Sequence, residues 1–177
     1  MNVEQSYVKT NKRESIVQIV ERRLNTDPED IKLGMELDFL NSYKSILATD
    51  KKRKVAISNT SNKWLSILES KEVNDYYMLM MISEELHTEV IAIIQSDVTG
   101  SWGFIEIANG KIQNTYFSEE DDEIEDLIEK KLDEKGINQR ICMFREVVRD
   151  KKWAVVTEKT IKNGKINLIF YDFVLEE

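Results

Sequence analysis

The densest set of chemically capable side chains lies between residues 119 and 134, where ten acidic residues accompany only two lysines. Seven of the first eight positions are acidic, namely Glu119, Glu120, Asp121, Asp122, Glu123, Glu125 and Asp126. Paired carboxylates can serve as general acid and base or can hold Mg²⁺ or Ca²⁺. However, the segment lacks the glycine turn and the distant glutamate of a calcium-binding loop. We therefore expect no specific metal site there.

This acidic segment also carries the whole charge imbalance of the chain. The 177 residues include 33 acidic and 25 basic side chains, for a formal net charge of -8, and residues 119–134 alone account for -8. Acidic residues in the first turn complement a helix dipole, but so many like charges repel one another, and a partner of opposite charge would relieve that repulsion. Two interpretations remain open: a surface that binds a basic protein, and a face that meets only water.

Other catalytic chemistry has little support in the sequence. The chain contains one histidine, His87, and one cysteine, Cys142, which together cannot supply the usual ligand sets of structural zinc. Cys142 stands between Ile141 and Met143, an apolar context typical of an unreactive thiol, and His87 stands at the end of a predicted helix. No nucleophile elbow and no glycine-rich phosphate loop occurs. We expect no catalytic residue and no cofactor.

Composition also limits the classes of partner and the compartment. An acidic protein is a poor general binder of nucleic acid, because phosphate attraction needs clustered lysine and arginine. No run of about 18 apolar residues is present, so we expect no association with a membrane. Residues 1–12 lack the apolar core of a secretion signal, and a lone cysteine fits a reducing cytoplasm. The expectation is a cytoplasmic protein with a single domain over residues 1–177, in which residues 1–12 form a flexible tail.

The spacing of apolar residues predicts three helices, over residues 13–25, 73–87 and 119–135. The third helix has an apolar stripe that consists of Ile124, Leu127, Ile128 and Leu132. Gly136 follows at the position where a glycine cap commonly ends a helix. The acidic segment is therefore expected to be an amphipathic helix with one face on the protein core.

Hairpins are predicted near residues 55–69, 90–117 and 153–175. The unbroken apolar run 90–94 is typical of a central strand that is buried on both faces, and Asn109-Gly110 is a strong two-residue hairpin signal. Alternating apolar residues favour a further strand within residues 27–50, whereas residues 140–150 have no clear pattern. The fold class that follows is α+β, with a mainly antiparallel sheet and about three packed helices.

A family resemblance rests on several short stretches. They are residues 63–69 (Lys-Trp-Leu-Ser-Ile-Leu-Glu), 83–86 (Ser-Glu-Glu-Leu), 90–94, 102–104 (Trp-Gly-Phe) and 109–110 (Asn-Gly). Together these stretches, within residues 54–134, resemble small α+β proteins of bacteria, some of which are classed as polymorphic-toxin immunity proteins. The resemblance implies inhibition of a cognate toxin by direct binding, without a cofactor.

The favoured hypothesis from the sequence is a non-catalytic binding protein whose acidic helix engages a basic partner protein. Trp102 and Tyr116 are the expected aromatic anchors beside that helix, since aromatic residues often dominate interface energies. The alternatives are a carboxylate-dependent, metal-assisted hydrolase and a structural or ligand-sensing subunit. A converging set of buried carboxylates would favour the enzyme, and an exposed acidic face beside exposed aromatic residues would favour the binding protein.

Overall fold

The computed structural model describes residues 2–24, 54–70, 75–96, 101–118, 122–139, 141, 144–147 and 153–157. Its strands are β1 Asn2–Val8, β2 Lys54–Ile57, β3 Leu65–Glu69, β4 Val90–Ser96, β5 Ser101–Ala108, β6 Lys111–Ser118 and β7 Ala154–Thr157. Its helices are α1 Arg13–Leu24, α3 Tyr76–Leu86, α4 Asp122–Glu134 and the short α5 Phe144–Val147. None of these helices has the length and apolar content needed to cross a membrane.

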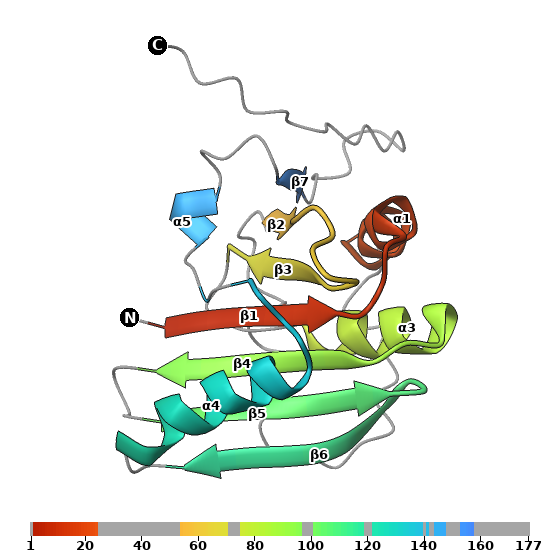
Figure 1. The fold of residues 1–177 in the computed structure, drawn as a ribbon. Coiled ribbons are helices and arrows are strands. Elements are labelled where there is room, and N and C mark those ends of the chain that lie inside the picture. Colours follow the sequence, from red (N-terminus) through yellow and green to blue (C-terminus); the bar gives the residue numbers. More distant parts are fainter. Residues whose placement is uncertain are drawn as a thin grey trace.

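The seven strands form one sheet in the order β6-β5-β4-β1-β3-β2-β7, and every neighbouring pair is antiparallel (Figure 1). The α+β class and the mainly antiparallel sheet are therefore confirmed. The three predicted helices are also present, with ends that lie within a few residues of the predicted ones.

The prediction of a flexible tail over residues 1–12 is wrong for residues 2–8, which form β1 in the middle of the sheet. β1 pairs with β3 on one side and with β4 on the other, and Gln5, Ser6, Tyr7 and Val8 are all buried. Apolar patterns in the sequence do not indicate this strand, because its buried residues include polar ones. The hydrogen bonds of these polar residues offset the cost of their burial. Gln5 Nε2, for example, donates to Ser66 Oγ across the β1–β3 pair.

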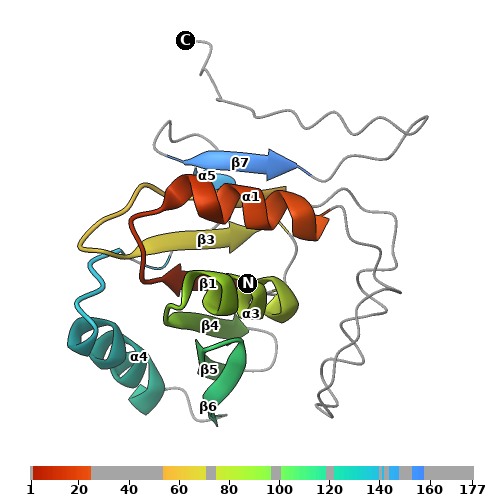
Figure 2. The same ribbon diagram turned by 90° about the vertical axis from the view of Figure 1, so that its right-hand side faces the viewer.

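Both faces of the sheet are covered. Alternate residues of β4 enter different clusters: Val90 and Ala92 pack with α1 and α3, whereas Ile91 and Ile93 pack with α4. Figure 1 shows α4 crossing in front of β4 and β5, and Figure 2 shows α4 apart from α1 and α3. A smaller cluster joins α5 to β2, β3 and β7. The prediction of a central strand buried on both faces is confirmed.

Two tight turns set the register of the hairpins. Asn109 and Gly110 have φ of 52° and 69°, as a type I′ turn requires, and they join β5 to β6. Between β2 and β3 the left-handed pair is Asn62 and Lys63, with φ of 49° and 68°, within the hairpin predicted near residues 55–69. The backbone bonds between Ser61 and Trp64, at 2.7 and 2.9 Å, close it.

Three predictions fall partly or wholly outside the described residues. These are the strand within residues 27–50, the second strand of the hairpin predicted near residues 153–175, and most of residues 140–150. The described part of the third hairpin is β7, which pairs with β2. Within residues 140–150, the structure describes the single turn of helix α5.

Candidate functional site

Helix α4 is held on the sheet by its apolar stripe and by its C-terminal cap. Ile128 and Leu132 are buried against β1 and β4. Gly136, with φ of 69°, donates its N–H to Asp133 O at 2.9 Å, and Ile137 donates to Leu132 O at 2.8 Å. This is the Schellman arrangement, in which a left-handed residue satisfies the last carbonyl groups of a helix. The sequence therefore fixes both the position and the end of α4.

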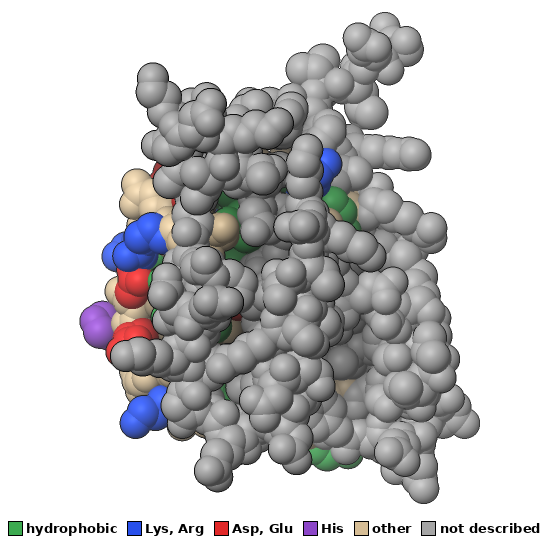
Figure 3. All heavy atoms as spheres, turned by 180° about the vertical axis from the view of Figure 1, so that it is seen from behind, with side chains coloured by type: hydrophobic (Ala, Val, Ile, Leu, Met, Phe, Trp, Pro, Cys, Tyr) green, Lys and Arg blue, Asp and Glu red, His purple; other side chains and the backbone are tan. Residues whose placement is uncertain are grey.

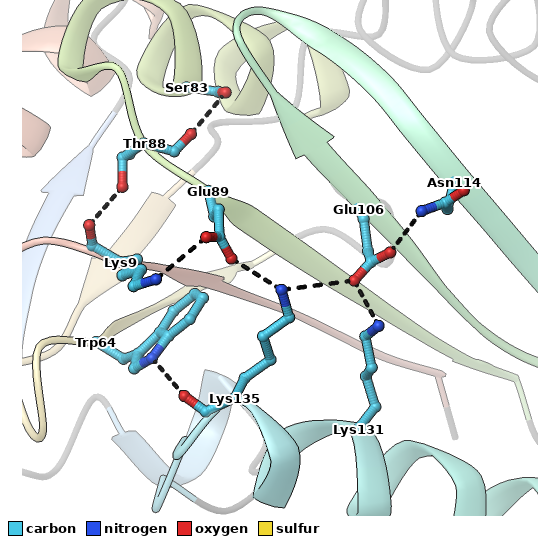
Figure 4. A network of polar contacts seen from close by, with 9 residues as sticks. All are labelled: Lys9, Trp64, Ser83, Thr88, Glu89, Glu106, Asn114, Lys131 and Lys135. Atoms are coloured by element: carbon cyan, nitrogen blue, oxygen red, sulfur yellow. Dashed lines mark hydrogen bonds and ion pairs between the residues drawn. The ribbon is translucent and has the colours of Figure 1, made fainter.

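The lysines on the inner side of α4 are engaged by glutamates of the sheet (Figure 4). Lys131 Nζ lies 2.6 Å from Glu106 Oε1, and Lys135 Nζ lies 2.9 Å from Glu89 Oε2 and 3.9 Å from Glu106 Oε1. Glu89 also pairs with Lys9 of the β1–α1 connection, at 3.1 Å. Three of these four ion pairs join α4 and its C-terminal end to the sheet and to Glu89 directly before β4, so the inner side of the helix is cationic and its charge is matched.

The pKa values of this network follow its geometry. The hydrogen bond from Lys135 lowers the pKa of Glu89 below its ordinary value, although burial opposes the shift. Burial would raise the pKa of Glu106, but hydrogen bonds from Lys131 and Asn114 outweigh it and lower that pKa. The bond to Glu89 raises the pKa of Lys135. The shifts therefore favour the charged forms of all three groups.

The other side of α4 faces solvent. Glu129, Asp133 and Glu134 are exposed, and within the described residues no ion pair neutralises them. Lys130 is the one basic residue among the exposed side chains described for α4. The helix thus presents an anionic outer face, which we call the acidic face and define by Glu129, Asp133 and Glu134.

The structure describes the site residues predicted from the sequence to different extents. Glu119, Glu120 and Asp121 lie outside the described residues. Asp122, Glu123, Glu125 and Asp126 lie in α4 and Trp102 lies in β5, but only their backbone is described. Tyr116 of β6 is exposed, as predicted for an anchor.

Sequence reasoning did not predict a role for Phe104 and misplaced Leu127. Tyr116 stacks on Phe104 of β5, with ring centroids 5.6 Å apart. Leu127 was predicted to lie in the buried stripe of α4, but its side chain is 37% exposed. Leu127 precedes Lys131 by one helical turn, and Lys131 Nζ lies 5.4 Å from the centroid of the Phe104 ring. Leu127 therefore belongs to the side of α4 that faces β5 and β6. The cross-strand spacing of Phe104 and Tyr116 was the available signal.

A second charged cluster is buried on the opposite face of the sheet. Asp75 caps α3 by accepting a hydrogen bond from Met78 N at 2.9 Å, and its other oxygen lies 2.9 Å from Arg23 Nε. This contact is an ion pair without aligned hydrogen-bond geometry. Glu69 accepts the backbone N–H of Asp75, and the Arg23 guanidinium lies 5.3 Å from the Tyr77 ring centroid. The cluster joins α1, β3 and α3, which is a structural role.

His87 ends α3 in a left-handed conformation, with φ of 49°. Its N–H bonds to Glu84 O at 3.3 Å, and Thr88 N–H bonds to Ser83 O at 3.1 Å. The imidazole is exposed at the surface (Figure 3). His87 thus terminates a helix, as its position in the sequence indicates.

No group of three or more histidine, cysteine, aspartate or glutamate side chains is placed to hold a metal ion within the described part of the chain. A comparison with protein families, curated proteins and solved structures finds no match to this chain. Among the described residues, a distinctive surface is the outer side of α4, with the exposed Tyr116 and Leu127 near it.

Proposed function

We propose that the protein is a non-catalytic binding protein whose acidic face on α4 engages a basic partner protein. One observation carries the proposal: Lys131 of α4 and Lys135 directly after it are already paired with Glu106 and Glu89, whereas no ion pair of the outward carboxylates is present among the described residues. Because the inner charge is matched internally, the outer charge is left to attract a partner.

The physical consequences suit a binding role. A surface of one sign speeds the encounter with an oppositely charged protein and rejects partners of like charge. Tyr116 and Leu127 are the two large apolar side chains that the described surface exposes most, and they lie at the margin of α4. Exposed apolar residues beside a charged rim are typical of protein interfaces. The resemblance to immunity proteins would make the partner a toxin that is inhibited by direct binding.

The test is affinity measurement on charge-neutralised variants. The first partner to try is the product of the reading frame immediately upstream, and proteins retained from a native lysate follow. We expect the variant Glu129→Gln/Asp133→Asn/Glu134→Gln to bind at least about tenfold more weakly than the unaltered protein. A second variant, with Gln at Glu119, Glu120, Asp122 and Glu123, extends the test to the start of the acidic segment.

The matched control removes exposed acidic residues from the other face of the sheet. Glu14 of α1 and Glu84 of α3 are both exposed. The variant Glu14→Gln/Glu84→Gln therefore reduces the net negative charge of the protein without changing α4. We expect this control to retain affinity to within about twofold. Equal affinity for the α4 variants and the unaltered protein would contradict the proposal. Binding should also weaken as salt is added, because exposed charges are screened.

A further inference from the structure

Strand β6 forms one edge of the sheet, and β5 is its neighbour among the described strands. A strand with one neighbour directs alternate N–H and C=O groups outward, where another extended chain can bind them. β6 has eight residues, twice as many as β7 at the other edge. The long edge is therefore the better template for an added strand.

The two halves of β6 differ in how well they are protected against pairing with another strand. The half next to the Asn109-Gly110 turn contains the charged Lys111 and a bulge, because the pairing register shifts between Glu106 and Ile107. There the Gln113 side chain also bonds to the carbonyl groups of Ala108 and Lys111, at 3.0 and 3.3 Å. Charges and bulges are the usual means by which an edge resists pairing. Residues 114–118 have neither, and β5 is the one strand described beside them, so within the described residues this half, which we call the open half, is the less protected one.

The open half lies beside an apolar surface. Tyr116 is 39% exposed and stacks on Phe104, and Leu127 lies on the side of α4 that faces β5 and β6. We call Phe104, Tyr116 and Leu127 the apolar margin. It adjoins the acidic α4, whose described exposed carboxylates include Glu134. An extended chain on the β6 edge would meet hydrogen-bonding groups, apolar side chains and negative charge together.

We propose that the partner docks by adding an extended segment to residues 114–118 of β6, with apolar side chains on the apolar margin and lysine or arginine side chains toward α4. This inference rests on the proposed function and specifies its binding mode, which is strand addition to an exposed sheet edge. A second copy of this chain is a poorer occupant. Antiparallel pairing of two β6 edges about a twofold axis would place both acidic helices on one face of the joined sheet, where they repel.

The probe is the amidated peptide Val-Thr-Lys-Thr-Val-Thr-Lys-Thr, in which valine and lysine lie on the same face of an extended strand, added to the full chain labelled with ¹⁵N. We expect its binding to shift the amide resonances of residues 114–118 and to slow hydrogen exchange there. The decisive comparison is the same peptide with N-methyl groups at alternate residues, which keeps the charge and removes the hydrogen bonds of one edge. Affinity for the methylated peptide should be at least about tenfold lower.

Two variants report on the edge itself. Thr115→Lys places a charge in the open half, and Tyr116→Ala removes the exposed ring of the apolar margin. We expect each to weaken peptide binding by at least about fivefold, whereas Gln18→Lys, which adds the same charge at an exposed site of α1, should leave it unchanged. The NMR spectrum of each variant shows directly whether the fold is kept, and Tyr116→Ala adds no charge to the sheet edge.

The outcomes separate the two proposals. If both peptides bind equally and neutralisation of Glu129, Asp133 and Glu134 weakens both, the acidic face binds basic chains and strand addition is overturned. If neither peptide binds and the resonances do not move, strand addition is overturned. The role of the acidic face in binding is then decided by the affinity test with the partner protein. If the chain sediments as a dimer that Thr115→Lys dissociates, the edge is occupied by a second copy and the basic segment is overturned as its occupant.

Discussion

The two faces of the sheet carry charged clusters of opposite character. On one face, Arg23 and Asp75 are 2% and 0% exposed and join α1 to the start of α3. On the other face, Lys131 and Lys135 bind Glu106 and Glu89 at the border between α4 and water, with side chains that are 17 to 41% exposed. Removing one partner of a buried pair leaves a charge without solvation, whereas water compensates for the loss of an exposed one.

The comparison shows that charge serves two structural purposes in this molecule. The buried cluster secures the cap of α3, and the half-exposed network secures α4. The carboxylates of the acidic face form no ion pair in either cluster among the described residues, although the negative charge of Glu134 helps to raise the pKa of Lys135. Stability measurements should therefore rank the three sets, and the ranking separates residues kept for the fold from residues available for a partner.

The largest effect is expected from Asp75→Ala, which removes the helix cap and leaves Arg23 buried without its counter-charge. We expect a loss of about 3 to 5 kcal/mol in the free energy of unfolding, measured by urea denaturation. Glu85→Gln is the matched control, because Glu85 pairs with Arg22 at 2.6 Å on the surface, and its cost should stay below about 1 kcal/mol. Equal losses in the two variants would remove the distinction between buried and exposed pairs.

A smaller effect is expected from Gly136→Ala at the end of α4. The left-handed φ of 69° disfavours any residue with a Cβ, and an added Cβ would lie 3.1 Å from Asn62 Nδ2. The expected cost is about 1 kcal/mol in unfolding free energy. Glu129→Ala, in the same helix but at a regular exposed position, should cost less. If both cost the same, the cap does not hold α4.

The network beneath α4 should make stability depend on pH at the acidic end. The folded-state pKa values of Glu89 and Glu106 lie below the ordinary 4.5, so their contribution is complete above pH 4.5 and is lost as pH falls through the lowered values. The raised pKa of Lys135 means that its contribution is complete below pH 10.5 and is lost as pH rises beyond it. Urea denaturation from about pH 7 to about pH 3 should show the Glu89→Gln/Glu106→Gln variant converging on the unaltered protein. A constant difference over that range would refute the assignment.

The smallest effect is expected from the acidic face itself. Neutralising Glu129, Asp133 and Glu134 should change the unfolding free energy by no more than about 0.5 kcal/mol, because surface substitutions without internal partners rarely matter to stability. Differential scanning calorimetry would detect a larger loss. Such a loss would assign the acidic face to the fold and would weaken its proposed role in binding.

Sequence patterns revealed those elements whose local chemistry agrees with their place in the fold. Ile128, Leu132 and Gly136 define α4 because apolar spacing and a cap glycine act within one helix, and Asn109-Gly110 defines its hairpin in the same way. β1 was missed because the hydrogen bond of Gln5 to Ser66 comes from a strand about sixty residues away, which no local pattern records.

The same distinction between local patterns and distant contacts applies to the candidate site. The acidic character of α4 is visible in the sequence, but the exposure of Leu127 is not, since its spacing fits the buried stripe. It depends on how α4 is rotated on the sheet, and that rotation reflects the burial of Ile128 and Leu132 together with the ion pairs that Lys131 and Lys135 make to Glu106 and Glu89. Contacts between residues distant in the chain cannot be read from periodicity.

The central place of β1 has a consequence for how the chain folds as it is synthesised. β1 separates β4, β5 and β6 from β3, β2 and β7, and it is translated before both of its neighbours. Its partner β4 ends at Ser96, so at synthesis rates of about 5 to 20 residues per second several seconds pass before both edges of β1 can be paired. Until then the backbone of β1 can pair with wrong partners.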